Sequence, residues 1–432
     1  MFFYLNRRLK VSISKKTVKD IDLTGKRIIM RVDFNVPMKD GVVQDDTRIK
    51  AAMPTINYIL AHKAKSLVLM SHLGDPKKDM EKAREKTVKD GKVFDEKKYL
   101  AGKHMLKPVC DHFAKLLGKE VKFAPDALGA DTKKLVDSLK DGEVLMLENT
   151  RFHKEETSKD AADREKMAKE LASYGDIFVN DAFGTAHRAH ASTETIAHFL
   201  PAVAGFLMEK ELEYLDEKVV KNPAKPFVAI IGGAKVSSKI SVLESLLEKV
   251  DKLIVGGGMA YTFLKAKGLS VGTSLIEDDM IEKARNILQK AYETHVYIYL
   301  PIDHIVTHEF SADAPFKHVA RGNIDEGEMG MDIGPLTIEK FQGALKGAKT
   351  VFWNGPLGVF EFPKFSKGTM AIAETLANLP DCITVIGGGD SVSAVNKAGV
   401  ADKMSHISTG GGASLELVEG KVLPGVAALM DK

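Results

Sequence analysis

The sequence has few of the residues that cross-link a chain or embed it in a membrane. Only two cysteines, Cys110 and Cys382, occur in 432 residues. They predict no disulfide framework and favour a reducing compartment. No apolar run approaches the roughly 20 residues that a membrane-spanning helix needs. An excess of charge of one sign is also missing, because 62 basic and 59 acidic residues leave a formal net charge of +3. This balance argues against a general nucleic-acid or membrane-surface binder.

The composition that remains is that of an ordinary globular protein. Hydrophobic residues make up 44% and charged residues 28%, which supports an ample core, and the length favours two or three domains. The apolar patch Met1–Leu5 is too short for a signal-peptide core, and charges follow it rather than precede it. We expect residues 1–13 to be a start-site extension or a poorly ordered tail, with an organelle address as the alternative.

Short apolar runs alternate with helical patterns along the chain, which is typical of an α/β fold. Polar clusters follow the runs of the first half, and glycines follow most runs of the second half. Ligands bind beyond the carboxyl ends of parallel strands, so the first half suits a small anionic substrate and the second half suits a nucleotide. The expected strands are Arg27–Val32, Ser66–Met70, Glu143–Leu147, Asp176–Val179, Phe227–Ile231, Lys252–Val255, Val296–Leu300, Thr350–Trp353 and Ile383–Ile386.

A helical pattern over Phe206–Lys221 ends at two prolines within residues 222–226, which predicts a domain boundary there. We predict two Rossmann-like three-layer α/β domains with parallel sheets, joined by a helical hinge. The predicted spans are 11–203 for the N-terminal domain, 204–222 for the linker helix and 223–420 for the C-terminal domain. Residues 77–104 are highly charged and nearly free of core residues, so we expect an inserted surface segment with some helix.

The stretch IIGGAKVSSKI (230–240) places two lysines after a glycine pair that ends an apolar run. We expect a helix from about Val236, with Lys235 and Lys239 on one side of its amino end. Cations there are unfavourable by up to about 1 kcal/mol, and a bound polyphosphate would reverse that sign. The stretch is not a P-loop. The alternatives are two solvated lysines or a phosphate site of another kind.

A second stretch, NDAFGTAHRAHAS (180–192), contains His187, Arg188 and His190. The two histidines could share a helical face and bind a metal, but no third ligand stands at a standard spacing. We favour a phosphate or carboxylate pocket with Arg188 as a bidentate donor. Arg48 and Arg151 are interpreted in the same way, with plain surface arginines as the alternative.

Two glycine-rich stretches of the second half could contact phosphates through their backbone. Asp390 follows Gly387–Gly389 and could hold Mg²⁺ on nucleotide phosphates, or it could cap a helix. The stretch TGGGAS (409–414) opens a helical pattern, so its free amides are a plausible anion cradle.

Several long motifs, in order, resemble phosphoglycerate kinase from about Ser14 to the C-terminus. They are RVDFNVP (31–37), SHLG (71–74), ENTRF (148–152), NDAFGTAHRAHAS (180–192), GGAKVSSKI (232–240), WNGPLGVFE (353–361), GGGDS (387–391) and STGGGASLELVEGKVLPG (408–425). The resemblance implies a glycolytic, two-domain, hinge-bending kinase. Such an enzyme transfers a phosphoryl group between 1,3-bisphosphoglycerate and ADP, giving 3-phosphoglycerate and ATP with Mg²⁺. It further implies a cytoplasmic monomer whose last segment, 421–432, returns to the N-terminal domain.

The resemblance also implies a role for individual residues. Those matching its 3-phosphoglycerate site are Asp33, Phe34, Asn35, Arg48, His72, Leu73, Gly74, Asp75, Arg151 and Arg188. Those matching its nucleotide site are Lys239, Gly330, Glu361, Gly388, Gly389, Asp390 and Ser391, with Glu361 at the ribose and Asp390 at the metal. The implied catalytic set is Arg48, Lys235, Lys239, Gly389 and Gly412.

One position departs from this pattern. The family usually has arginine after SHLG, where it helps hold the substrate phosphate, and this chain has Asp75. We expect Asp75 to face solvent or cap a helix, while a nearby cation (Lys77, Lys78 or Arg84) replaces the missing arginine. The alternative is that nothing compensates and the substrate site is simply weaker.

Two other classes of function remain as alternatives. A dinucleotide-dependent dehydrogenase has similar glycine-ended strands, but no G-x-G-x-x-G opens a helix here. A non-catalytic nucleotide-binding protein could use the same fold, although Arg48, Lys235, Lys239 and Asp390 are all present.

Overall fold

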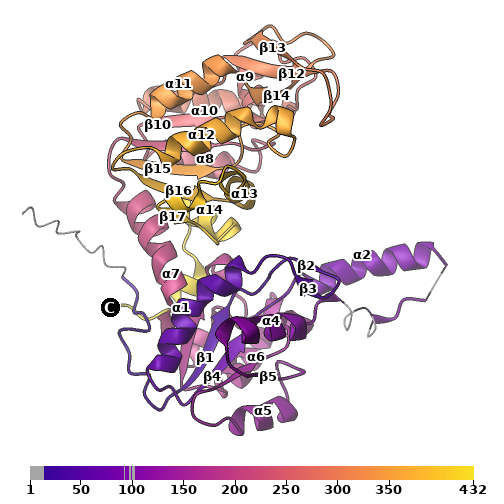
Figure 1. Ribbon diagram of the computed structural model, residues 1–432, viewed down its shortest axis with the longest axis vertical. Coiled ribbons are helices and arrows are strands. Elements are labelled where there is room, and N and C mark those ends of the chain that lie inside the picture. Colours follow the sequence, from indigo (N-terminus) through magenta and orange to yellow (C-terminus); the bar gives the residue numbers. More distant parts are fainter. Residues whose placement is uncertain (1–13, 92, 97–98, 100–102) are drawn as a thin grey trace, which may run out of the picture. The chain divides into compact units, whose positions relative to one another are not determined.

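The computed structural model describes residues 14–91, 93–96, 99 and 103–432. The N-terminal extension expected over residues 1–13 lies outside the described residues. The chain divides into two compact units (Figure 1), one of Met1–Leu212 with Val422–Lys432 and the other of Glu213–Lys421.

Unit 1 is built on a six-stranded parallel sheet with the order β5-β6-β4-β1-β7-β8. Its strands are β1 (Arg27–Val32), β4 (Ser66–Met70), β5 (Val121–Phe123), β6 (Glu143–Met146), β7 (Ile177–Asp181) and β8 (Ala202–Ala204). The central strands are apolar and almost wholly buried, as expected for parallel strands with both faces covered.

Helices close the core of unit 1. They are α1 (Thr47–Ala61), α4 (Lys107–Leu117), α5 (Ala130–Asp137) and α6 (Ala161–Ala172). Met30 and Val32 of β1 share a buried cluster with Ile56 of α1 and Phe113 of α4. Side chains alternate along a strand, so Arg31 points to the opposite face of the sheet.

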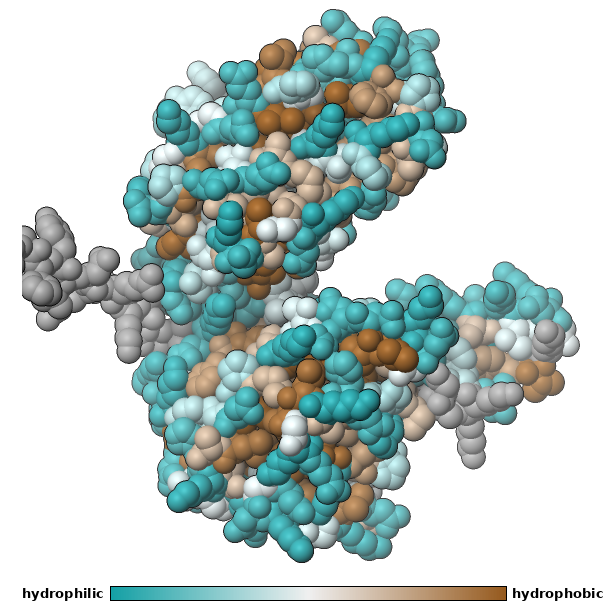
Figure 2. Space-filling view, in the orientation of Figure 1, coloured by the Kyte–Doolittle hydropathy of each residue, from teal (hydrophilic) through white to brown (hydrophobic). Residues whose placement is uncertain are grey.

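Two smaller features leave the body of unit 1. The hairpin β2 (Met38–Lys39) and β3 (Val42–Val43) follows β1. The charged segment contains helix α2 (Pro76–Lys89), which projects from the unit (Figure 1) and has mostly hydrophilic side chains on the face seen in Figure 2. The helical part of the predicted insertion is therefore confirmed where the structure describes it.

Unit 2 contains a second six-stranded parallel sheet, with the order β11-β10-β9-β15-β16-β17. Its strands are β9 (Phe227–Ile231), β10 (Lys252–Val255), β11 (Tyr297–Tyr299), β15 (Thr350–Asn354), β16 (Ile383–Gly387) and β17 (His406–Ile407). Numbered from β9, this is the 3-2-1-4-5-6 order of a doubly wound fold. Its strand order reverses between β9 and β15, where such folds bind ligands.

The helices of unit 2 follow the strands, as in a doubly wound fold. They are α8 (Ile240–Leu246), α9 (Met259–Ala266), α10 (Ile281–Glu293), α11 (Pro335–Leu345), α12 (Lys367–Ala377), α13 (Gly389–Lys397) and α14 (Gly412–Val418). Unit 2 also has an antiparallel sheet that the sequence did not predict. It consists of β12 (Asp303–Thr307), β13 (Lys317–Ala320) and β14 (Met329–Ile333).

The chain passes between the units as a continuous helix. Helix α7 (Phe206–Glu211) runs directly into a π-helical segment, η5 (Leu212–Lys221). The last segment, Val422–Lys432, belongs to unit 1: the Met430 N–H donates to the Ala202 carbonyl at 3.0 Å, and the Gly425 N–H to the Ala186 carbonyl at 2.8 Å.

The predicted fold class is confirmed, because both units are α/β with parallel sheets. No helix among the described residues combines the length and apolar character needed to cross a membrane.

Candidate functional site

The polar residues of the first half meet at one edge of the unit 1 sheet. Strands β6, β4, β1 and β7 are neighbours, and all are parallel, so their carboxyl ends share one edge. Asp33 directly follows β1 and His72 lies just beyond β4. Arg151 lies in the turn after β6, and Arg188 in the loop after β7.

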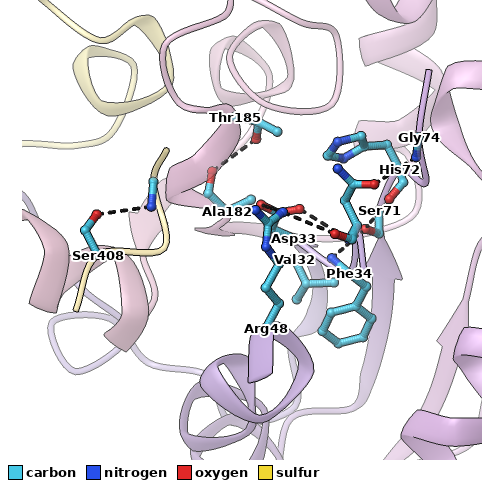
Figure 3. A network of polar contacts seen from close by, with 12 residues as sticks. Val32, Asp33, Phe34, Arg48, Ser71, His72, Gly74, Ala182, Thr185 and Ser408 are labelled. Atoms are coloured by element: carbon cyan, nitrogen blue, oxygen red, sulfur yellow. Dashed lines mark hydrogen bonds and ion pairs between the residues drawn. The ribbon is translucent and has the colours of Figure 1, made fainter. Parts of the chain in front are cut away.

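Arg48 and Asp33 form an ion pair at this edge (Figure 3). The Arg48 Nη1 donates to the Asp33 carboxylate at 2.9 Å and to the Asn35 carbonyl at 3.3 Å. The Arg48 side chain is 37% exposed. Helix α1 therefore presents a partly open guanidinium to any ligand at the edge of the sheet.

The loop after β4 is held from several directions. The Gly74 N–H donates to the Asn35 side-chain oxygen at 2.8 Å, and the Arg151 Nη1 donates to the Gly74 carbonyl at 2.7 Å. The Asn149 side-chain nitrogen donates to the Leu73 carbonyl at 2.9 Å. These three hydrogen bonds hold the loop backbone in place within unit 1.

Two of the predicted substrate residues have enclosed side chains. Phe34 is fully buried and contacts the ring of Phe113, and Leu73 is also buried. The backbone N–H of Phe34 donates to the Ser71 hydroxyl at 2.9 Å. Their apolar side chains pack in the core of unit 1, so any contact of these two residues with a ligand must come from their backbone.

Arginines gather at this edge and act on one another electrostatically. Burial, Arg31 and Arg188 lower the pKa of Arg151, while Asp75 and Glu156 act in the opposite direction. Burial and the charges of Arg151, Arg31 and Arg188 lower the pKa of His190 to about 3. His190 is therefore neutral at pH 7, and a bound anion would stabilise the charged forms of the neighbouring arginines. This is the electrostatic arrangement expected of a site for a phosphate or carboxylate.

The metal alternative for residues 187–190 has no support in the structure. His187 is hydrogen-bonded to a cation, since the Arg188 Nε donates to His187 Nε2 at 3.1 Å. Throughout the described part of the chain, no group of three His, Cys, Asp or Glu residues could hold a metal ion.

Asp75 caps the inserted helix. Its carboxylate accepts a hydrogen bond from the Lys78 N–H at 3.3 Å, and Pro76 is the first residue of α2. Of the three cations expected to replace the missing arginine, Arg84 is bound elsewhere, because its Nη2 lies 2.9 Å from the Glu96 carboxylate. Lys77 and Lys78 remain as candidates.

The second candidate site is a cavity of about 550 Å³ in unit 2, next to the carboxyl ends of β9, β10 and β15. Most of its wall is apolar or glycine, including Leu275, Phe310 and Val359. Of the predicted nucleotide residues, Gly330, Glu361 and Asp390 line it. An apolar slot with few polar groups is typical of a small-molecule site.

Gly330 lies against the ring of Tyr261. A Cβ at this position would lie 1.7 Å from the Tyr261 hydroxyl oxygen, which no side chain could tolerate. The Gly330 N–H donates to the Ser274 hydroxyl at 2.9 Å. The unpredicted strand β14 therefore forms one wall of the cavity, and only glycine fits at this point of it.

The other predicted nucleotide residues meet around Asn354 at the end of β15. The Lys239 ammonium donates to the Asn354 side-chain oxygen. Gly388 has φ +86°, and a Cβ there would lie 2.8 Å from the Asn354 side-chain nitrogen. The Ser391 hydroxyl accepts a hydrogen bond from the Gly355 N–H at 2.6 Å. Burial lowers the pKa of Lys239, while Asp390 and Glu419 act in the opposite direction.

The helix begins later than predicted, so of the two lysines only Lys239 lies at its amino end. Helix α8 begins at Ile240 with Lys239 as its N-cap, and Lys235 lies in the preceding loop. The loop is tied down by Ser237, whose N–H donates to the Glu277 carboxylate at 3.0 Å. The two lysines are therefore not four residues apart on one helix face; Lys235 is exposed and Lys239 is half-buried.

The two remaining predicted glycines begin helices. Gly389 is the first residue of α13 and Gly412 the first residue of α14. Helix α14 lies beside α8, because the Ser245 hydroxyl donates to the Val418 carbonyl at 3.1 Å. Both glycines are thus in positions whose backbone N–H groups lack partners within the helix.

The structure adds residues that the predicted sets do not contain. Asn354 and Arg31 lie inside motifs that carry the family resemblance, and each contacts a predicted site residue. Asn149 contacts the Leu73–Gly74 loop in the same way. Their presence in those motifs was the only signal in the sequence, because neither periodicity nor charge distinguishes a side chain that supports a ligand residue.

Arginines at the edge of one parallel sheet and a cavity beside another are the features of an α/β protein with candidate ligand sites in both of its units. Comparison with known proteins gives the particular family. The family model described as phosphoglycerate kinase matches residues 18–421, and the chain belongs to this family. Its function is that of phosphoglycerate kinase in glycolysis, and the family uses ATP and ADP.

Relatives and solved structures agree over nearly the whole chain. The phosphoglycerate kinase of Treponema pallidum (strain Nichols) is 55% identical over 417 residues, 96% of this chain and 99% of that protein. The Enterococcus faecalis (strain ATCC 700802 / V583) enzyme is 52% identical over 421 residues, 97% of this chain and 100% of that protein. The structure of phosphoglycerate kinase from Coxiella burnetii has a TM-score of 0.82 at 39% identity, covering 96% of this chain and 98% of that one. The structure of the phosphoglycerate kinase from Pyrococcus horikoshii OT3 has a TM-score of 0.79 at 32% identity, and it also covers 96% of this chain and 98% of that one.

Proposed function

We propose that unit 1 binds 3-phosphoglycerate, that unit 2 binds ATP or ADP with Mg²⁺, and that the phosphoryl group passes directly between them when the units close. The observation that carries this proposal is the gathering of Arg48, Arg151 and Arg188 at the carboxyl edge of the unit 1 sheet. An anionic ligand is what such a cluster needs. The nucleotide-sized cavity lies in the other unit, so the two substrates have separate sites.

The residue assignments follow the two sites. The side chains proposed to bind 3-phosphoglycerate are those of Asp33, Asn35, Arg48, His72, Arg151 and Arg188. The backbone groups proposed to bind it are those of Phe34, Leu73 and Gly74. Gly330, Glu361 and Asp390 line the nucleotide cavity. We assign the nucleotide phosphates to Lys239, Gly388, Gly389, Ser391 and Gly412. We assign the ribose to Glu361. Asp75 is not assigned a substrate contact, since its carboxylate caps α2.

The reaction makes modest chemical demands on these residues. A carboxylic acid acceptor has a pKa of roughly 3.5 to 4, so it is ionised at neutral pH and needs no general base. The residues must instead bring two anions together and stabilise charge on the phosphoryl group in flight. Arg48, Lys235 and Lys239 are the cations suited to this task. Water must be excluded during transfer, because it would otherwise hydrolyse ATP.

Asp390 fits a magnesium site that is completed by the nucleotide. It is exposed, it lines the cavity, and it supplies the oxygen ligand that Mg²⁺ prefers. Magnesium commonly takes one or two carboxylates plus substrate phosphates, so the lack of a three-residue cluster among the described residues is compatible with it. When bound, the ion would neutralise charge on the nucleotide phosphates.

We further propose that the chain is a monomer located in the cytoplasm. Sedimentation of the purified chain would test the oligomeric state.

The direct test is turnover of 3-phosphoglycerate and ATP with and without Mg²⁺, coupled to removal of the 1,3-bisphosphoglycerate formed. Turnover that disappears on chelation and returns with Mg²⁺ is expected. Asp390→Asn should shift the Mg²⁺ dependence to higher concentration, whereas Asp279→Asn, an exposed aspartate outside the cavity, should not. Nucleotide binding without any turnover would favour the non-catalytic alternative.

A further inference from the structure

Arg31 lies behind the candidate substrate site rather than in it. It is the fifth residue of β1, it points away from the cluster formed by Met30 and Val32, and its side chain is fully buried. A guanidinium with no exposed surface cannot contact a substrate directly. Any role in the reaction must pass through a neighbour.

Arg31 uses its donors in three fixed directions. The Nε donates to the Ser192 hydroxyl at 2.9 Å, and Nη1 donates to the Val32 carbonyl. The Nη2 lies 3.1 Å from His72 Nδ1. A guanidinium carries five donors, no acceptor and a permanent charge. His72 Nδ1 must therefore be the acceptor, and it cannot carry a proton.

The positive charge of Arg31 is balanced within the same network. Glu156 is fully buried, and its carboxylate accepts hydrogen bonds from the Ser192 hydroxyl at 2.6 Å and the Ser192 N–H at 2.9 Å. Ser192 is thus the link between the two buried charges. A buried arginine lacking such a counter-charge would be strongly destabilising.

The surroundings of His72 also oppose a second proton. Burial lowers the pKa of His72 well below its usual value, and the charges of Arg31, Arg151, Arg48 and His190 act in the same direction. A neutral imidazole whose Nδ1 accepts a hydrogen bond carries its single proton on Nε2. Nδ1 faces the sheet and Arg31, which leaves Nε2–H as the only donor of the ring.

We propose that Arg31 is a positioning residue that holds His72 as the neutral Nε2–H tautomer, so that His72 serves the anionic substrate as a hydrogen-bond donor. The buried chain Arg31–Ser192–Glu156 fixes both the ring orientation and the site of the proton. His72 is accordingly not an acid or base in the reaction. This inference rests on the proposed function of His72 as a ligand of 3-phosphoglycerate.

The tautomer can be measured on the whole protein without any mutation. Nitrogen NMR of the full chain with ¹⁵N-labelled histidine distinguishes a protonated from an unprotonated ring nitrogen. The signals of His72 are those present in the spectrum of the parent and missing from the spectrum of the His72→Gln variant. We expect a neutral ring with the proton on Nε2 at pH 7. A proton on Nδ1, or on both nitrogens, would overturn the proposal.

The consequence for binding is tested with Arg31→Lys, which keeps the charge but not the three directed donors. We expect a mixture of tautomers and a roughly tenfold weaker affinity for 3-phosphoglycerate, with the affinity for ADP unchanged. Arg27→Lys is the matched control, because Arg27 lies on the same strand and pairs with Asp176 away from the site. Parent-like tautomer and affinity in Arg31→Lys would contradict the inference.

If the Arg31→Lys variant does not fold, a second variant, Ser192→Ala, tests the same inference. Ser192→Ala retains Arg31 and removes the link to Glu156, and it should weaken 3-phosphoglycerate binding and alter the His72 signals. Unchanged signals and affinity would count against the inference. If the parent itself binds no 3-phosphoglycerate, the proposed function fails, while the tautomer still decides whether Arg31 positions His72.

Discussion

Lys239 and Asn354 are hydrogen-bonded at the edge of the second sheet, the lysine ammonium donating to the amide oxygen. Asn354 ends β15, and Lys239 caps α8, which follows β9. The two strands flank the point where the strand order reverses, and this contact therefore fixes a cation where a doubly wound sheet binds its ligand. Burial already lowers the pKa of Lys239, so bound phosphate should stabilise its charged form.

Lys235 is expected to act on the transition state. It is exposed, in a loop fixed by the Ser237–Glu277 contact, and we propose that it meets charge that develops only during transfer. Lys235→Ala should lower kcat by on the order of 100-fold or more and change the ADP affinity little. Steady-state kinetics and calorimetry check this, with the exposed Lys283→Ala of α10 as control. A Lys235→Ala enzyme with near-normal kcat would refute the assignment.

The second prediction concerns closure of the two units. The candidate ligand residues lie in separate units, so neither ligand alone contacts both sets. Small-angle scattering should detect a smaller radius of gyration only when 3-phosphoglycerate and a nonhydrolysable ATP analogue with Mg²⁺ are present together. An unchanged radius with both ligands bound would argue against closure as part of the reaction.

The third prediction concerns the missing arginine at position 75. Asp75 places a negative charge beside an anion site, and a unit-charge pair at about 4 Å is worth roughly 1 kcal/mol in water and more at lower dielectric. Lys77→Ala with Lys78→Ala should weaken 3-phosphoglycerate binding. Arg84→Ala should not, because Arg84 pairs with Glu96.

Asp75→Asn separates the charge of this residue from its capping role, because asparagine also caps helices. It should tighten 3-phosphoglycerate binding a few-fold at low ionic strength, and the gain should shrink as salt is added. Calorimetry at fixed ionic strength measures both effects. If the double lysine variant binds 3-phosphoglycerate as the parent does, no cation of α2 compensates for Asp75.

The fourth prediction is a pH dependence set by Asp181. Its buried carboxylate accepts hydrogen bonds from the Leu207 and Met208 N–H groups at 2.9 and 3.2 Å, at the start of α7. Burial raises its pKa to about 7, against roughly 3.9 in an unfolded chain. Between these values the native state retains a proton that the unfolded state loses. This residue therefore makes the fold less stable as pH rises from about 4 to 7.

Asp181→Asn keeps the acceptor and removes the ionisation. Its free energy of unfolding should exceed that of the parent at pH 8 by about 1 kcal/mol or more, and the difference should shrink towards pH 5. Denaturant titrations at both pH values measure this, with Asp131→Asn, whose side chain is 90% exposed, as the control. A difference that is equal at both pH values would contradict the predicted ionisation.

The sequence predicted the central strands well for a physical reason. Strands β1, β4, β9 and β10 begin and end at the predicted residues because each is an apolar run bounded by polar residues or glycine. The antiparallel β12–β14 sheet was missed, since its strands mix charged and apolar residues and match neither a buried run nor a strict alternation. Strand β14 nevertheless supplies Gly330 to the cavity, so that wall of the site could not be anticipated from strand patterns.

The candidate site was predictable in its residue types but not in its contacts. The start of α8 was misplaced because Val236 fits the helical spacing while being buried in the preceding loop. Arg31 could not be separated from a substrate-binding arginine by sequence, because burial behind His72 is a property of the folded sheet. Asp75 was expected to cap a helix or face solvent, and the hydrogen bond from Lys78 confirms the cap.

The most direct test of the central claim is calorimetric titration of the Arg188→Ala chain with 3-phosphoglycerate and, separately, with ADP and Mg²⁺. Arg188 is exposed in unit 1 and lies outside the nucleotide cavity of unit 2. We expect the affinity for 3-phosphoglycerate to fall by roughly tenfold or more while the affinity for the nucleotide stays at the parent value. Unchanged 3-phosphoglycerate binding, or an equal loss for both ligands, would contradict a division of the substrates between the two units.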